Sequence, residues 1–139
     1  MLIKTSLQKQ LINIESPNAF ILFTNTLYGL IDNSINKGFK SIVFICIGTD
    51  RSTGDSLGPL VGYKISNIKH PNVYIHGSLE NPVHAKNLNK TIEEIRHIYT
   101  KPLIIAIDAC LGKMEHIGYV SIGTGPIKPG SAMNKDLLP

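Results

Sequence analysis

The stretch that decides the fold is SIVFICI, Ser41–Ile47, followed by the polar segment GTDRSTGDSLGP over residues 48–59. A short and nearly continuous apolar run is typical of a strand buried on both faces, as in a parallel sheet with helices on each side. The polar segment predicts a loop and then a helix that begins at Asp55 or Ser56 and runs to about Ile68. A strand, a loop and a helix in this order are the first half of a parallel β-α-β unit.

Helix and strand signals alternate on both sides of this stretch. Upstream, Ser16-Pro17 predicts an N-cap and first helical residue, and a helical period of apolar residues follows until Gly38 ends it. Downstream, Asn81-Pro82 predicts the start of another helix, which runs to about Tyr99. The further predicted strands cover residues 73–77, 103–107 and 117–122.

This alternation predicts an α/β fold: a three-layer α/β/α sandwich around a mainly parallel sheet. The chain of 139 residues is long enough for one core and too short for two, so we expect a single domain over residues 1–139. With 42% hydrophobic and 17% charged residues, the composition excludes a disordered chain.

Composition also bounds location and partners. No apolar run approaches the ~18 residues of a membrane span, and the N-terminus lacks the apolar core of a signal peptide. Two cysteines make no disulfide framework, which favours a reducing, cytoplasmic compartment. The formal net charge of +4 comes from scattered lysines, so we expect neither a nucleic-acid surface nor a membrane partner.

Polar side chains follow the predicted strands. In an open α/β sheet, ligands bind outside the carboxyl ends of the strands. The candidates there are Asp50, Arg51 and Asp55 after the first strand, Glu80 and His84 after the second, and Asp108 and Cys110 after the third. We therefore expect Asp55, His84 and Asp108 to converge at one edge of the sheet.

Two carboxylates stand out in this set. Asp55 occupies the place of the lysine of a phosphate-binding loop, where its charge would compete with phosphate, so a nucleotide site is not expected. Asp108 directly follows a buried strand, where an unpaired charge is costly. Both admit a structural role, as a helix cap and a turn residue. As a pair they could instead act together, because two nearby carboxylates resist ionising at once and so provide one acid and one base.

The remaining candidates have weaker signals. His84 could join the two aspartates as a metal ligand, or it could be a solvated or capping side chain. Cys110 could be a nucleophile, although a small buried thiol is commoner, and Cys46 is expected in the core.

Three motifs together resemble the YyaC-type sporulation protein family. They are IGTDRSTGDSLGPLVG (residues 47–62), LENPVHAKNL (residues 79–88) and AIDACLG (residues 106–112). This family is similar in fold to the germination protease of spores and to hydrogenase maturation endopeptidases. The resemblance implies a sporulation-associated peptidase that cleaves a specific protein, such as a small spore protein, in the forespore or spore core. The alternative is a non-catalytic sporulation protein that binds a partner at the same sheet edge.

The resemblance also assigns roles to residues. Asp55 and Asp108 match the two aspartates implicated in the germination protease, and they would activate water on a peptide carbonyl. Asp50, Arg51, Glu80 and His84 would contact the substrate. The hydrogenase-maturing relatives recognise nickel in their substrate through a later histidine. This chain has no counterpart of that histidine, so the resemblance implies no metal or cofactor.

The resemblance implies that proteins of this family are longer at the C-terminus than this sequence. Family members continue with a further strand and a closing helix beyond Leu138. The resemblance therefore indicates truncation at the C-terminus, in this sequence or in this member of the family. An uncovered sheet face would favour a homodimer.

Overall fold

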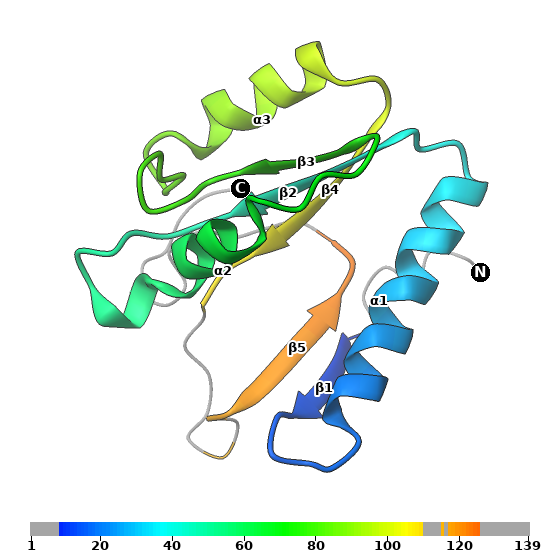
Figure 1. Ribbon diagram of the computed structural model, residues 1–139, viewed down its shortest axis with the longest axis vertical. Helices are drawn as coiled ribbons and strands as arrows, with labels where there is room; N and C mark the ends of the chain where they lie inside the picture. Colours follow the sequence, from blue (N-terminus) through cyan, green and yellow to red (C-terminus); the bar gives the residue numbers. More distant parts are fainter. Residues whose placement is uncertain (1–8, 110–114, 116, 126–139) are drawn as a thin grey trace. The chain divides into compact units, whose positions relative to one another are not determined.

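A computed structural model describes residues 9–109, 115 and 117–125 of the chain (Figure 1). They form a mixed α/β structure with two sheets. The chain divides into two compact units, which are described separately. The parallel-sheet unit comprises residues 38–109, and the antiparallel-sheet unit comprises residues 9–37, 115 and 117–125.

The parallel-sheet unit contains three strands in the order β3-β2-β4. They are β2 (Ser41–Cys46), β3 (Val73–His76) and β4 (Pro102–Ile107), and both strand pairings are parallel. Val43, Ile45 and Cys46 in the central strand β2 have no exposed surface. Burial raises the pKa of the Cys46 thiol to about 11, so this cysteine is an uncharged core residue at neutral pH, as predicted.

Two helices belong to this unit. A short 3-10 turn, η2 (Thr53–Asp55), precedes α2 (Leu57–Ile65), and α2 contacts all three strands. The second helix is α3 (Leu88–Ile98). The core joins strands, loop and α3 through Val43, Ile45, Ile47, Val83, Leu88 and Ile95. The strand-helix alternation expected from SIVFICI onward is therefore confirmed within this unit.

Glycines let α2 approach the sheet. A Cβ at Gly58 would overlap the backbone of Ile47, and a Cβ at Gly62 would overlap the backbone carbonyl of Gly77. Any larger residue at either position would push α2 away from the carboxyl end of β2.

The prediction that a helix begins at Asn81-Pro82 is wrong, because α3 begins at Leu88. Val83 forms an isolated parallel bridge with Ile47, so the backbone around Val83 is extended and pairs beside β2. The polar residue at the start of α3 is Asn87, whose Oδ1 accepts the His84 N–H at 2.8 Å and whose side-chain amide donates to the Pro82 carbonyl at 3.1 Å. His84 consequently lies in the loop before α3 and not in the first turn of a helix.

The antiparallel-sheet unit corrects a second prediction. Its strands β1 (Lys9–Asn13) and β5 (Tyr119–Gly123) pair antiparallel with each other. The strand predicted over residues 117–122 exists, but within the described chain it does not join the parallel sheet. Strand β1 is not predicted from the sequence, because its five residues, KQLIN, include only two apolar side chains and show no alternation.

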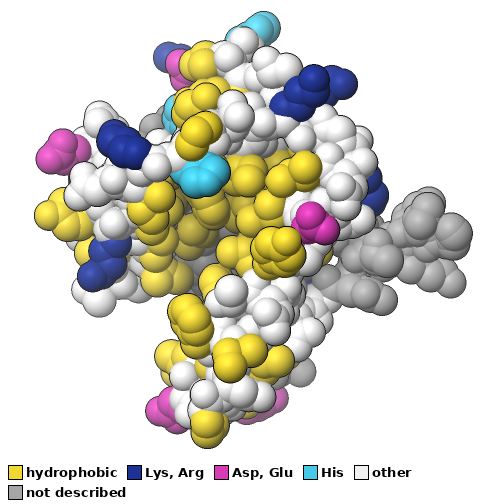
Figure 2. All heavy atoms as spheres, turned by 45° about the vertical axis from the view of Figure 1, so that its right-hand side comes forward, with side chains coloured by type: hydrophobic (Ala, Val, Ile, Leu, Met, Phe, Trp, Pro, Cys, Tyr) yellow, Lys and Arg dark blue, Asp and Glu magenta, His cyan; other side chains and the backbone are white. Residues whose placement is uncertain are grey.

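Helix α1 (Ala19–Asn36) completes this unit and contacts β1. It begins two residues later than Pro17, because the Ser16 carbonyl accepts the Ala19 N–H at 3.0 Å in a turn. Gly38, with φ of +109°, follows its end as expected. Large apolar side chains are visible on the surface of the molecule (Figure 2). Those exposed on α1 include Phe20, Ile21, Tyr28 and Ile35. In the described part of the chain, no helix combines the length and apolar character needed to cross a membrane.

Candidate functional site

Three consecutive backbone N–H groups at the end of β2 organise the carboxyl edge of the parallel sheet. They belong to residues 47–49, and each donates to a different segment of the chain. The acceptors are the carbonyl oxygens of Ile107, at 2.8 Å from Ile47 N, of Val83, at 2.8 Å from Gly48 N, and of Asp55, at 2.9 Å from Thr49 N.

These bonds position the candidate residues. Asp108 follows Ile107 directly, His84 follows Val83 directly, and Asp55 is itself an acceptor. Three segments that are distant in sequence therefore meet at one sheet edge, as the topological argument predicts. The roles assigned to these side chains remain predictions.

Asp55 is the last residue of η2, and its exposed fraction is 9%. It is the only charged residue in the described chain that is classed as buried. The N-cap of α2 is Ser56, whose hydroxyl donates to the Thr53 carbonyl at 2.9 Å. Asp55 therefore lies one residue before the N-cap position of α2, and Ser56 at that position makes no side-chain capping hydrogen bond.

Asp108 follows β4 and is half-buried. Its Oδ1 atom is shielded from solvent, so the carboxylate turns one oxygen towards the protein. Cys110 lies outside the described residues.

The proposed substrate-binding residues divide into two groups. Asp50 and Arg51 are exposed in the turn between β2 and η2, where the Thr49 hydroxyl accepts the Arg51 N–H at 3.2 Å. Glu80 is exposed and His84 is half-buried, and both line a hollow of about 810 Å³. Asp50 and Arg51 do not contribute to that hollow.

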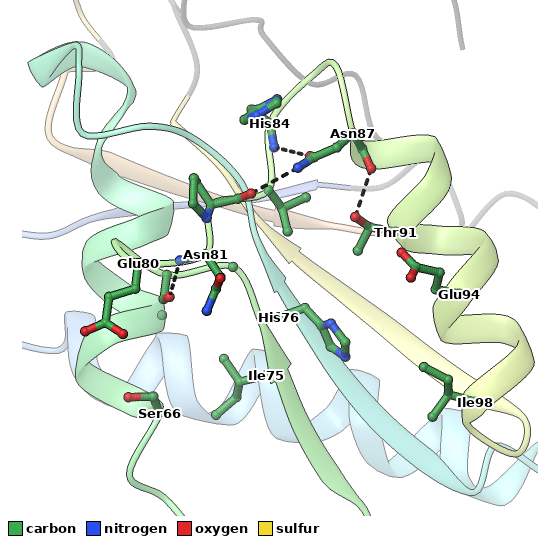
Figure 3. Close-up of a pocket in the computed structure, with 15 residues that line it drawn as sticks. Ser66, Ile75, His76, Glu80, Asn81, His84, Asn87, Thr91, Glu94 and Ile98 are labelled. Atoms are coloured by element: carbon green, nitrogen blue, oxygen red, sulfur yellow. Dashed lines mark hydrogen bonds between the residues drawn. The ribbon is translucent and has the colours of Figure 1, made fainter.

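This hollow, the β3–α3 groove, is bounded by the end of β3, the loop over residues 78–84, one face of α3, Gly62 in α2 and Ser66 at the end of α2 (Figure 3). Asp55 and Asp108 are not among its lining residues. The groove and the two aspartates are thus two separate features, which meet through the Val83-His84 segment that lines the groove and pairs with the end of β2.

His76 is not part of any sequence motif, yet it lies in the lining of this groove. His76 Nε2 lies 2.8 Å from the Tyr99 hydroxyl, and Tyr74 stacks on Tyr99 with ring centroids 4.3 Å apart. Burial lowers the pKa of His76, and the nearby Glu94 carboxylate partly opposes this shift. The period-two spacing of Tyr74 and His76 in VYIH is the signal that could have placed both side chains on one face.

The described candidate residues do not form a three-ligand metal site. Among the residues that the structure describes, no group of three His, Cys, Asp or Glu side chains could hold a metal ion. Asp55, His84 and Asp108 are all described, so the alternative in which they form such a three-ligand set has no support.

The fold and this edge define a mixed α/β protein whose polar residues gather where parallel strands end. The chain belongs to the family described as "Protein of unknown function (DUF1256)", whose model matches residues 11–139. It is 47% identical over 109 residues to the "Uncharacterized protein YyaC" of Bacillus subtilis (strain 168). That match covers 78% of this chain and 53% of the relative, so the chain spans about half the length of the curated protein it matches. No solved structure matches the chain at a significant level. The resemblance to YyaC-type proteins is therefore confirmed at the level of the family.

Proposed function

We propose that this chain carries the aspartate pair of a sporulation-associated peptidase, with a three-layer fold of the hydrogenase-maturation-peptidase kind. The observation that carries the proposal is the meeting of the Asp55 and Asp108 segments at the N–H groups of residues 47–49. Asp55 is buried and Asp108 has a buried Oδ1, as expected for carboxylates held in place for chemistry and not merely solvated.

The proposed reaction is hydrolysis of a peptide bond in a specific protein substrate. One carboxylate removes a proton from water as the water oxygen attacks the carbonyl carbon, and the other, protonated, donates its proton to the leaving amine. The two residues exchange protonation states in one turnover, so neither is assigned permanently as the acid. Glu80 and His84, at the neighbouring groove, would bind the substrate chain.

The test is cleavage of small spore proteins. The chain is incubated with a purified set of these proteins, and the fragments are identified by mass spectrometry. We expect cleavage at a defined bond, and we expect Asp55→Asn and Asp108→Asn each to lower the rate by about 100-fold or more. The double variant should lose no more than either single one, because the two carboxylates act as a unit.

Asp32→Asn is the matched control, since Asp32 is exposed on α1 in the other unit. It should retain the full cleavage rate. Circular dichroism and melting temperature establish that all variants are folded. Full activity in a folded Asp55→Asn variant would exclude Asp55 from the mechanism, because Asn replaces Asp well in a cap but cannot exchange the proton.

The second candidate is a non-catalytic sporulation protein that binds a partner at this edge. The observation in its favour is that the β3–α3 groove is lined by Glu80 and His84 but by neither aspartate. Stable co-purification of a small spore protein without cleavage, unaffected by Asp55→Asn, would favour this candidate over the peptidase.

A further inference from the structure

In the part of the chain that the structure describes, the β3–α3 groove lies beside a strand edge that pairs with no further strand. Within the described residues β3 is at the edge of its sheet and pairs only with β2. An edge strand presents backbone N–H and C=O groups to whatever lies beside it, and an extended peptide can add there as a further strand. Ile75, His76 and Gly77 at the end of this strand line the groove.

One face of α3 forms the opposite wall. Thr91, Glu94 and Ile98 recur at helical spacing, and all three line the groove. Figure 3 shows His76 and Glu94 directed into the space between strand and helix. A chain lying along β3 would therefore place the side chains of one of its faces against α3.

The charge of the lining is opposite to that of the protein. The chain carries 14 Lys and Arg residues and a formal net charge of +4, yet none of the described residues that line the groove is Lys or Arg. Its acidic residues are Glu80 and Glu94, and both are exposed, so their carboxylates can meet a partner at little desolvation cost. This complementarity favours a cationic occupant.

We infer that the β3–α3 groove binds an extended, Lys- or Arg-containing segment of a partner protein, which adds to β3 as a strand and places cationic side chains beside Glu80 and Glu94. The inference rests on the proposed function in one respect only, which is that the bound segment belongs to the substrate. The Val83-His84 segment, which lines the groove and bridges to Ile47, would lead that chain towards the edge that carries Asp55.

The test uses a fluorescein-labelled peptide of alternating Val and Lys residues and measures fluorescence anisotropy with the full chain at low salt. We expect saturable binding, which the Glu80→Gln/Glu94→Gln double variant weakens about fivefold. Glu93→Gln is the matched control, because Glu93 is exposed on the same helix but does not line the groove. It should bind as the unaltered chain does. Equal weakening by Glu93→Gln, or equal binding of a Val-Glu peptide, would overturn the inference.

Methylation of backbone nitrogens in the peptide distinguishes addition to β3 as a strand from electrostatic attraction of the lysines alone. Two Val-Lys peptides are methylated on alternate residues, one in each register. We expect at least one of them to lose binding, because methylation removes an N–H that the edge of β3 would pair with. If both methylated peptides, or the polyamine spermidine used as a competitor, bind as well as the parent peptide, the site is a general cation site and the inference is wrong.

The outcome is distinguishable from that of the proposed function. Asp55→Asn should bind the Val-Lys peptide with unchanged affinity, since Asp55 does not line the groove. Peptide binding without cleavage of any spore protein would leave the groove inference standing and remove the peptidase. Cleavage of a spore protein by a chain that does not bind the peptide would support the peptidase and contradict the groove inference.

Discussion

The two longest helices bury their apolar residues very differently. Helix α1 has 18 residues rich in Phe, Leu and Ile, and none of them is buried. Helix α3 has 11 residues, most of them polar, yet Leu88 and Ile95 are buried against the parallel sheet. The apolar residues of α3 fall on one face, so a few of them suffice to attach it. The number of buried residues in a helix therefore depends on the surface that the helix packs against, and not on its content of apolar residues.

The largest change in the free energy of unfolding is expected when the Ile95 side chain, which attaches α3 to the core, is shortened. Ile95 has no exposed surface and belongs to the core cluster, so Ile95→Ala should lower the free energy of unfolding by about 2–5 kcal/mol. Ile21→Ala on α1 removes the same atoms from a residue that is 61% exposed, and it should change the stability by no more than about 0.5 kcal/mol. Urea unfolding followed by circular dichroism measures both. A comparable loss for Ile21→Ala would show that the apolar residues of α1 are covered in solution.

A smaller effect is expected at two helical glycines. Gly58 in α2 lies against the backbone of Ile47, so Gly58→Ala should destabilise the protein by about 1–3 kcal/mol. Gly29 in α1 has nothing within 4 Å of the position of an added Cβ, so Gly29→Ala should stabilise it by about 0.5–1 kcal/mol. Opposite signs in melting temperature would confirm that α2 is in close contact and that the middle of α1 is open. Equal signs would contradict it.

The smallest effect concerns pH. Burial lowers the pKa of His76 below its ordinary 6.5, while Glu94 partly opposes the shift and Tyr99 contacts the ring. The unfolded chain therefore takes up this proton at a higher pH than the folded one, so the contribution of His76 is complete above pH 6.5 and is lost as the pH falls through the folded value.

We expect the unfolding free energy to decrease as the pH falls from about 7 through 6.5 and below, and His76→Gln to reduce that decrease. His70→Gln, at an exposed histidine beside Pro71, should leave the pH dependence as it is. If the two variants have identical pH profiles, burial of His76 does not contribute to stability.

Much of the parallel sheet could be predicted from the sequence. The runs that form β2, β3 and β4 are short and mostly apolar, as is typical of strands in a parallel sheet, and the central strand β2 is the one that contains buried residues. The position of Asp55 and Asp108 at a common edge followed from the same reasoning, since the carboxyl ends of parallel strands share one side of the sheet. These are local signals combined with a general rule of topology.

Other features were decided by tertiary structure. Strands β1 and β5 pair although they are more than 100 residues apart in the sequence, and neither strand has a sequence pattern that identifies its partner. The segment at Asn81-Pro82 carries a good helix-start signal, but Val83 pairs with Ile47 in a parallel bridge, and α3 begins at Leu88, after a turn over residues 85–87. The β3–α3 groove exists because β3 lies at the edge of the sheet and because one face of α3 is not buried in the core. The sequence by itself thus determined the three segments of the parallel sheet and the polar residues that follow them, whereas long-range pairing, which competes with local propensity, determined β1, its partner β5 and the start of α3.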